Sequence, residues 1–487
     1  MNRYVCLVVI LVLVLASMGQ KLTGITQGLP VEGVLSLGDW SVEGDQQGGD
    51  LGAAVATAGD FDGDGYADVV IGVPVYDKDA SNDGAVLVFF GSGSGLGDMP
   101  PDWAVGSGNQ GSRFGCSVGA AGDVNQDGFD DLVVGAQDFN NGVTRTGAAF
   151  VFYGAPRSSL SATPAWSYVS DQQDSQLGVS VGAAGDVNGD GYADIIVGAR
   201  WYDDGQTNEG AALVFFGSDA GPSDVADWMI EGDQSGASLG SSVATAGDVN
   251  GDGYSDVIVG APYYDCAAGE DAGAVFVYLG SATGLSQSAG WWFCGAQAGG
   301  WLGAAVSTAG DINGDGYADV IVGAPHYDGD QADVGAMLAF YGSPSILPAT
   351  PNWQAEGAET GWSFGASVGA AGDVNGGGYD DIIVGAPYLT RDQAREGGAF
   401  VFRGSAIGLF GSAFWQGEGN KSETEFGASV GAAGDVDGDG YADVIIGAPE
   451  FKKNTIRYGK ALVHFGAQAQ DPDLASVYLP LIWRASH

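Results

Sequence analysis

The chain alternates short apolar runs with acidic, glycine-rich turns, and this pattern returns seven times. Each acidic turn is followed by a β-branched run that ends in glycine, as in Val69 to Gly72. Such a run predicts a short strand that is buried on both faces. The turns begin at aspartates spaced 62 or 63 residues apart: Asp60, Asp123, Asp186, Asp248, Asp311, Asp373 and Asp435. A fixed period of this length predicts a repeat architecture.

Each repeat carries signals for four strands. A Phe-Gly or Leu-Gly pair precedes the turn, the β-branched run follows it, and a segment of the type Gly84 to Gly91 comes third. The fourth signal is a tryptophan twenty residues before each turn: Trp40, Trp103, Trp166, Trp228, Trp291, Trp353 and Trp415. Seven four-stranded units predict an all-β, seven-bladed β-propeller with four antiparallel strands per blade.

The order of these signals predicts how the ring closes. The chain enters through the Trp40 strand and leaves through Leu462 to Phe465, so the first strand is expected to complete the last blade. This arrangement hides an edge that would otherwise pair with another chain. We expect a signal peptide over residues 1–19, the propeller over 35–467 and a C-terminal tail over 468–487.

The acidic turns have the pattern of a cation-binding loop. In the first copy, Asp60, Asp62, Asp64 and Asp68 occupy positions 1, 3, 5 and 9, and Tyr66 at position 7 can offer its carbonyl. Oxygen ligands in a flexible loop suit Ca²⁺. Without a cation, two carboxylates this close would repel by about 3–4 kcal/mol at an effective dielectric near 20. Solvated acidic turns are the alternative, but seven copies in register favour calcium.

The expected ligands occupy the same five positions in each loop, except that the sixth loop has none at position 5. They are Asp60, Asp62, Asp64, Tyr66, Asp68, Asp123, Asn125, Asp127, Phe129, Asp131, Asp186, Asn188, Asp190, Tyr192, Asp194, Asp248, Asn250, Asp252, Tyr254, Asp256, Asp311, Asn313, Asp315, Tyr317, Asp319, Asp373, Asn375, Tyr379, Asp381, Asp435, Asp437, Asp439, Tyr441 and Asp443. Up to seven Ca²⁺ are expected. The sixth site should be the weakest, because Gly377 replaces the carboxylate at position 5.

An EF-hand opens with the same acidic pattern but needs a Glu at position 12. That position is Ile or Val in all seven copies, so the EF-hand is rejected. Instead, Phe114-Gly115, the acidic loops and Gly260-Ala261-Pro262 resemble the FG-GAP repeat of integrin α-subunit propellers. The resemblance implies that the calcium loops are hairpins between the first two strands of a blade, on the lower face. It also implies that ligands bind on the upper face.

The net charge limits the classes of possible partner, and the N-terminal segment indicates where the protein is located. With 61 Asp and Glu against 16 Lys and Arg, the net charge of −45 argues against nucleic acid and anionic membranes. Arg3 precedes an apolar run from Tyr4 to Leu15 and then small residues, which predicts a secretory signal peptide. An uncleaved anchor is the alternative, although the run is short for a membrane span. We expect a monomer, secreted or at the cell surface, whose mature chain has no transmembrane segment.

Three function classes remain. The leading one is an adhesion or interaction module for a protein or glycan. The second is a calcium-dependent polysaccharide-acting enzyme, since some polysaccharide lyases use propellers with similar repeats. A purely structural surface protein is the third. The chain has only three histidines and His326 is expected to be a surface residue, so an enzyme finds little support.

Two residue sets mark the expected upper face. Sixteen residues after each first aspartate stands a large apolar side chain, which either contacts a ligand or anchors its loop between blades: Tyr76, Phe139, Tyr202, Tyr264, Tyr327, Leu389 and Phe451. Residues 201 to 390 contain no Lys or Arg. Five such residues in the loops of repeats six and seven form a group that we call the basic sector: Arg391, Arg395, Lys452, Lys453 and Arg457. This sector either contacts an anionic partner or balances local charge.

The cysteines add one constraint. Cys266 and Cys294 lie in the fourth repeat and should meet near the upper rim of one blade. In an oxidising compartment they are expected to form a disulfide. Cys116 occupies a strand position filled by small residues in other repeats, so it is expected to be a buried, inert thiol.

Overall fold

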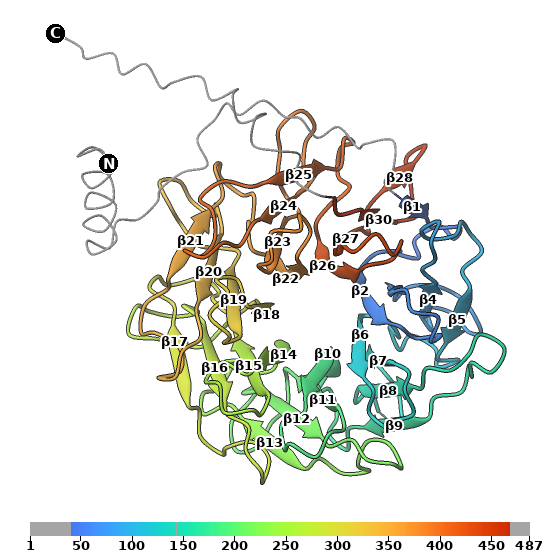
Figure 1. Cartoon of the computed structure of the whole chain (residues 1–487), viewed down its shortest axis with the longest axis horizontal. Coiled ribbons are helices and arrows are strands. Elements are labelled where there is room, and N and C mark those ends of the chain that lie inside the picture. Colours follow the sequence, from blue (N-terminus) through green and yellow to red (C-terminus); the bar gives the residue numbers. More distant parts are fainter. Residues whose placement is uncertain (1–39, 143, 468–487) are drawn as a thin grey trace, which may run out of the picture.

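A computed structural model of the protein describes residues 40–467 except residue 143. Seven four-stranded sheets surround a central axis, and each sheet is one blade (Figure 1). The described residues form strands and no helix, so none can supply a membrane-spanning helix. The seven-bladed, all-β prediction is confirmed. The predicted signal peptide and C-terminal tail lie outside the described residues.

Strands follow one another outward from the axis in each blade (Figure 1). Blade 1 contains β2 (Ala54–Gly59), β3 (Asp68–Val73), β4 (Ala85–Phe89) and β5 (Trp103–Gly106). Blades 2 to 4 contain β6 (Ser117–Gly122), β7 (Asp131–Ala136), β8 (Ala148–Phe152), β9 (Trp166–Val169), β10 (Leu177–Gly185), β11 (Asp194–Ala199), β12 (Ala211–Phe215), β13 (Trp228–Glu231), β14 (Ser242–Gly247), β15 (Asp256–Ala261), β16 (Ala274–Tyr278) and β17 (Trp291–Cys294). Blades 5 to 7 contain β18 (Ala305–Gly310), β19 (Asp319–Ala324), β20 (Ala336–Phe340), β21 (Trp353–Glu356), β22 (Ser367–Gly372), β23 (Asp381–Ala386), β24 (Gly398–Phe402), β25 (Trp415–Glu418), β26 (Ser429–Gly434), β27 (Asp443–Ala448), β30 (Lys460–His464) and β1 (Trp40–Glu43). A small hairpin of β28 (Lys452–Lys453) and β29 (Ile456–Arg457) projects from blade 7.

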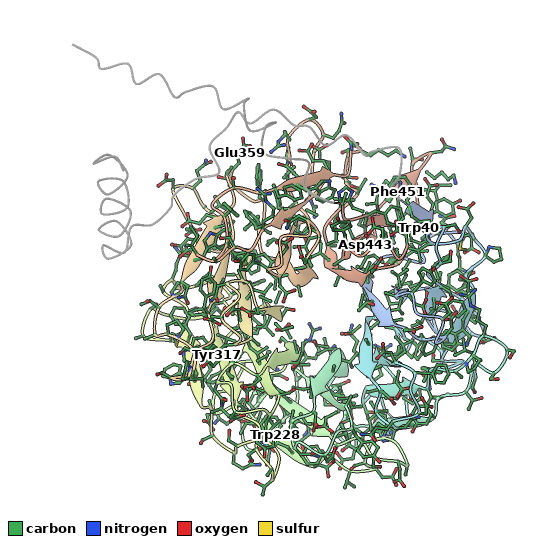
Figure 2. The ribbon with its side chains drawn as sticks, viewed as in Figure 1. Trp40, Trp228, Tyr317, Glu359, Asp443 and Phe451 are labelled. Carbon is green, nitrogen blue, oxygen red and sulfur yellow. A yellow bond between two sulfur atoms is a disulfide. The ribbon has the colours of Figure 1, made fainter. Side chains whose placement is uncertain are left out.

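The core lies between blades. Every residue of β3 and β4 is buried, because neighbouring blades cover both faces of the sheet. The outer tryptophans seal the boundaries: the Trp103 ring lies 5.7 Å from Phe61 and 5.4 Å from Phe152 of the next blade. Figure 2 shows Trp40 and Trp228 at the outer rim of the ring, in different blades.

Two glycines of the repeat motif let adjacent blades approach. A Cβ on Gly72 would lie 2.0 Å from the carbonyl oxygen of Gly115 in blade 2, so no larger residue fits there. Gly115 itself has φ +82°, and its N–H donates to the Gly135 carbonyl at 2.9 Å. The Phe-Gly pair of one repeat therefore contacts the Gly-Ala-Pro-type segment of the preceding repeat.

The ring closes as the strand order predicts. β1 pairs antiparallel with β30, and Trp40 lies opposite Val463. Across this seam, Lys453 forms an ion pair with Glu43 at 2.9 Å, and Arg457 forms one with Asp50 at 2.9 Å. The N-terminal strand is thus the outer strand of blade 7, and the prediction is confirmed.

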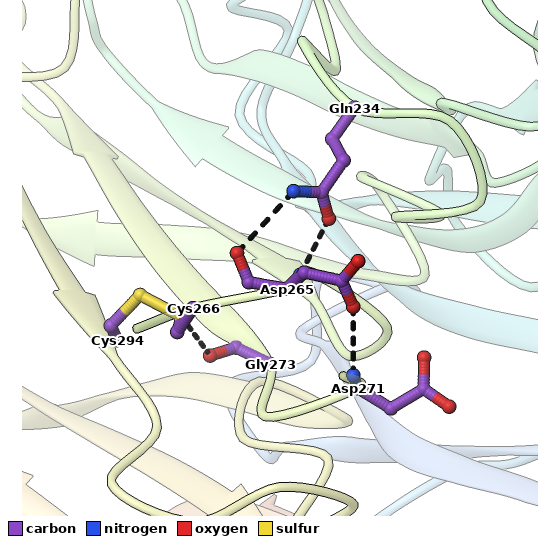
Figure 3. The surroundings of a disulfide bond; sticks show 6 residues. All are labelled: Gln234, Asp265, Cys266, Asp271, Gly273 and Cys294. Carbon is purple, nitrogen blue, oxygen red and sulfur yellow. Dashed lines mark hydrogen bonds between the residues drawn. A yellow bond between two sulfur atoms is a disulfide. The ribbon is translucent and has the colours of Figure 1, made fainter. Parts of the chain in front are cut away.

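Blade 4 contains the predicted disulfide. Cys266, in the loop after β15, bonds to Cys294 at the end of β17, with a Cα–Cα distance of 6.0 Å (Figure 3). Beside it, the Gln234 amide bridges the backbone N–H and carbonyl of Asp265. Cys116 is unpaired and partly buried, and burial raises the pKa of its thiol to about 11, as expected of an inert cysteine.

Because Trp40 lies on the strand that closes the ring, its substitution tests how much this closure contributes to stability. Its indole packs 4.9 Å from Phe89 and donates to the Gly97 carbonyl at 2.7 Å. We expect Trp40→Ala to lower the free energy of unfolding by about 3–5 kcal/mol, because it opens a cavity at the seam. Trp292→Ala, at a side chain 57% exposed on β17, should change it by less than about 1 kcal/mol. Equal shifts of the urea midpoint for the two variants would contradict this account.

A ring of candidate cation loops

The seven acidic loops form one continuous ring. Each connects the first two strands of its blade, as β2 and β3 are connected in blade 1. In every blade the backbone N–H at position 8 donates to the position 1 carbonyl of the preceding loop, for example Ala193 to Asp123 at 3.1 Å and Ala67 to Asp435 at 3.0 Å. The loops therefore share one face, which we call the lower face. The loops after the second strands lie at the other strand ends, on the upper face.

Position 9 holds a buried aspartate in each loop. Asp194 is typical: one carboxylate oxygen accepts the Val187 N–H at 2.9 Å, and the other accepts the Gly217 N–H at 2.9 Å. Without a cation in the loop, burial raises the pKa of this carboxyl to about 7, although the two N–H donors oppose the shift. The same holds for Asp131, Asp256, Asp319 and Asp443, with a pKa of about 8 for Asp68 and about 6 for Asp381.

The carboxylate at position 1 accepts hydrogen bonds from the backbone of its own loop and so fixes the conformation of the loop. In the seventh loop, Asp435 accepts N–H groups from Gly438 at 2.7 Å, Asp439 at 3.1 Å and Gly440 at 3.0 Å. At position 5, Asp439 accepts the Tyr441 N–H at 3.0 Å. Carboxylate oxygens at positions 1, 3 and 9 lie within 4.8 Å of one another in this loop and in the first.

Position 3 is asparagine in five loops. In the second, third and fourth loops its amide donates to the position 5 carboxylate, as Asn125 does to Asp127 at 3.0 Å. The sixth loop differs because Gly377 leaves no carboxylate at position 5. There Asn375 donates to Asp381 at 2.6 Å instead. The neighbouring Asp380 accepts the Asp311 N–H at 2.8 Å and so serves the fifth loop, not the sixth.

The aromatic residues at position 7 join neighbouring loops: at six of the seven boundaries the ring packs on a glycine at position 4 of the preceding loop, and the second loop has Gln126 at that position. A Cβ on Gly251 would lie 2.5 Å from the Tyr317 ring of the next blade, and one on Gly438 would lie 2.5 Å from the Tyr66 ring. Figure 2 marks Tyr317 and Asp443 in the fifth and seventh blades. Sequence analysis assigned position 7 a carbonyl ligand but did not anticipate this packing role of its side chain.

The donor set fits a hard cation. Each loop presents carboxylate or amide oxygens at positions 1, 3 and 9, and all but the sixth also at position 5, which is the chemistry that Ca²⁺ prefers. Two of these oxygens, Oδ1 of Asp60 and Oδ1 of Asn313, are buried without a hydrogen-bond partner. An unpaired buried oxygen is costly, and a cation in the loop would satisfy it.

Two further side chains at the loops were missed by the sequence analysis. Asp130, at position 8 of the second loop, accepts the Asp60 N–H at 2.9 Å. Arg157 of blade 2 forms ion pairs with Asp62 and Asp64 of the first loop. Its sequence signal was a basic residue at a repeat position that is small or apolar in the other described repeats.

On the upper face, the large apolar residues act as loop anchors. Leu389 and Phe451 are buried, and Phe139 packs 5.4 Å from Phe150. Tyr264 packs 5.8 Å from Phe276. The other members also pack on the hydrophobic clusters between blades. Packing between blades, one of the two alternatives for this set, describes them best.

The basic sector is ion-paired throughout. Arg391 pairs with Glu418, Arg395 with Glu425 and Lys452 with Glu423, in addition to the seam pairs of Lys453 and Arg457. At five blade boundaries an amide side chain bridges to the next blade, as Gln46 does to Asp77. Glu359 and Lys421 stand at the other two corresponding positions. Because every basic side chain of the sector is paired with a carboxylate of this protein, the charge-balance interpretation is favoured.

The comparisons with known proteins agree with this geometry. The model of the FG-GAP repeat matches residues 51–89, 114–152, 177–215, 239–278, 302–336, 364–402 and 426–460. The chain belongs to the FG-GAP repeat family. Each match to the FG-GAP model spans the acidic loop and the first two strands of a blade, and it ends within the third strand or at its last residue. The predicted resemblance is confirmed.

Integrins are prominent among the relatives of this FG-GAP chain. Integrin alpha-7 of Homo sapiens is 36% identical over 185 residues, which are 37% of this chain and 15% of the relative. Integrin alpha-5 of Xenopus laevis is 30% identical over 238 residues, 47% of this chain and 21% of the relative. A longer match is phosphatidylinositol-glycan-specific phospholipase D of Bos taurus, 28% identical over 403 residues, 73% of this chain and 46% of the relative. The chain thus spans less than half the length of these relatives.

Among solved structures, an exotype rhamnogalacturonan lyase, YesX, overlaps 85% of this chain and 72% of its own. The TM-score is 0.42 and the sequence identity is 10%. A likeness at this level supports no conclusion about function.

Proposed function

We propose that this FG-GAP chain is an extracellular calcium-binding propeller that serves as an adhesion or interaction module for a protein or glycan, and that it is not an enzyme. The observation that carries the proposal is the ring of seven oxygen-donor loops on the lower face. The integrin relatives, which share the repeat, support it. Extracellular calcium is millimolar and suits loops of this kind.

Calcium would be held by the residues at positions 1, 3, 5, 7 and 9 of each loop. A bound ion would neutralise the converging carboxylates and satisfy the unpaired oxygens of Asp60 and Asn313. Its positive charge would also offset the free-energy cost of burying an ionised aspartate at position 9, such as Asp194. In this proposal the ions stabilise the lower face and leave the upper face for a partner.

The ligand face is proposed from exposed aromatic groups on the upper side. Trp201 and Tyr388 follow β11 and β23 and are 39% and 38% exposed. Arg200 lies over the Trp201 ring at 5.0 Å, and Arg395 lies over the Tyr388 ring at 4.3 Å. Flat, exposed rings held by cations are suited to contact a sugar or a protein side chain.

A direct experiment separates the three function classes. The calcium-loaded chain is applied to a glycan array and to immobilised extracellular proteins, while polysaccharides incubated with it are assayed for new reducing ends. We expect calcium-dependent binding without cleavage, which Trp201→Ala weakens and Trp292→Ala retains. Cleavage would replace this proposal with the enzyme. Absence of any binding would favour a structural surface protein.

The phospholipase relative makes a second enzyme class worth testing. Its match extends over more of this chain than the integrin matches do. However, the aligned part is 46% of that protein, so its activity does not pass to this chain by similarity. Release of a phosphatidylinositol-glycan-anchored protein from vesicles by the purified chain would show that the proposal of a non-enzyme is wrong.

Calcium removal should destabilise the fold. At about ten times its Kd, each ion stabilises the folded chain by roughly 1.4 kcal/mol. With seven ions, EDTA should lower the melting temperature by about 10 °C or more. Differential scanning calorimetry with EDTA, and with EDTA already saturated by calcium as the control, measures this. An unchanged melting temperature after exhaustive dialysis would exclude calcium as a structural ligand.

The sixth loop should be the weaker site that its sequence predicts. Gly377→Asp supplies the missing carboxylate, and we expect it to raise calcium affinity at this loop about tenfold, because both a ligand and a charge are restored. Equilibrium dialysis against radioactive calcium measures the bound ions at each free concentration. Gln393→Glu adds the same charge on an exposed loop of the same blade and should change nothing. Equal binding curves for the two variants would refute the assignment.

A further inference from the structure

The first loop contains a positive charge supplied by the protein itself. In each blade the segment after the third strand lies over the preceding loop, as Ala155 shows by donating to the Phe61 carbonyl at 3.0 Å. In blade 2 this segment carries Arg157, three residues after Gly154. The equivalent residues in the other described segments are Ser94, Ala220, Thr283, Ser345 and Ile407. Among these segments, only that of blade 2 brings a basic side chain.

Arg157 is directed at two expected calcium ligands. Its Nε donates to a carboxylate oxygen of Asp62, and its Nη2 donates to Asp64 at 2.7 Å. The guanidinium also lies over the Phe90 ring, 4.7 Å from its centroid. The Asp62 side chain has no exposed surface, whereas those of Asp64 and Arg157 are 34% and 50% exposed. Solvent, and therefore an ion, can reach this ion pair.

The seventh loop provides an internal reference. It has aspartate at positions 1, 3, 5 and 9, as the first loop has. Within residues 40–467, no Lys or Arg forms an ion pair with its carboxylates. Oδ1 of Asp435 accepts two N–H groups, whereas the equivalent Oδ1 of Asp60 is buried without a partner. The two loops therefore differ in structure although their acidic residues are the same.

We propose that Arg157 is a built-in competitor for the cation at the first loop: its guanidinium and Ca²⁺ bind the same carboxylates, Asp62 and Asp64, and exclude each other. This inference rests on the proposed calcium function. Ca²⁺ binds carboxylate oxygens at about 2.3–2.6 Å, and Nε and Nη2 of Arg157 already occupy one oxygen of each of these carboxylates by hydrogen bonds. The first loop is therefore a weaker calcium site than the seventh. Calcium binding there breaks the ion pairs by which Arg157 of blade 2 contacts blade 1.

The cause of this weakness is distinct from that of the sixth loop. The sixth loop lacks a ligand at Gly377, so a carboxylate must be added to strengthen it. The first loop has all its ligands, so removal of Arg157 is sufficient. Hydrogen bonds between charged groups of this kind change binding by about tenfold to a hundredfold, which is the gain expected for Arg157→Gln.

The experiment compares calcium binding by four variants of the full chain in equilibrium dialysis. Arg157→Gln should strengthen one site. Arg145→Gln removes the same charge from an exposed position in the same blade and should not. The gain must disappear when Asp60→Asn is added, since Asp60 is a first-loop ligand that does not contact Arg157, and must persist when Asp435→Asn is added instead.

A second readout follows Arg157 in the wild-type chain itself and uses the variant only to assign its resonance. With ¹⁵N-labelled arginine, the Nε resonance of Arg157, identified by its loss in Arg157→Gln, should shift on calcium addition to the position of a solvent-exposed arginine. A resonance that stays unchanged at saturating calcium would overturn the proposal, as would equal binding by Arg157→Gln and Arg145→Gln. Absence of calcium binding in every variant would instead overturn the calcium function itself.

Discussion

The buried aspartate at the ninth position of each loop is the contact on which the ring depends. In blade 3, one oxygen of Asp194 fixes the acidic turn through Val187, and the other fixes the end of the third strand through Gly217. The next residue, Ser218, donates to the Val124 carbonyl of the preceding loop at 3.1 Å. One carboxylate therefore joins the first three strands of its blade and also places that blade against its neighbour.

This contact has an electrostatic consequence at neutral pH. Because the folded-state pKa of Asp194 is raised above its ordinary value, the folded state favours the protonated carboxyl. Its contribution to stability is therefore fully present below the ordinary pKa and declines as the pH rises toward about 7. The same sign applies in all seven blades. A cation held by the ionised carboxylates would reverse this loss, so the fold and the proposed calcium sites are linked through the same side chains.

Sequence alone predicts the parts of this structure that recur with the period. The strands, the loops, the closure through Trp40 and the gap at Gly377 all follow from repeat positions, because each position has the same environment in every blade. The pairing of Cys266 with Cys294 also follows, since both lie in one repeat. The contact between Arg157 and Asp62 could not be predicted, because it joins residues 95 positions apart whose distance depends on how two blades are placed. The ion pairs of Lys453 with Glu43 and of Arg457 with Asp50 could not be predicted either, because each joins two ends of the chain that lie more than 400 positions apart.

Departures from the repeat are where this chain differs from a generic propeller, and the ring determines how far each one acts. A change in the first loop reaches the second through the Asp130 N–H, which donates to the Asp60 carbonyl at 3.3 Å. It reaches the seventh through the Ala67 N–H on the Asp435 carbonyl. The second and seventh loops are therefore the first to respond to a structural change in the first loop. Replacement of the Arg157 guanidinium by an ion would act through the Ala67 hydrogen bond on blade 7, whose outer strand closes the ring.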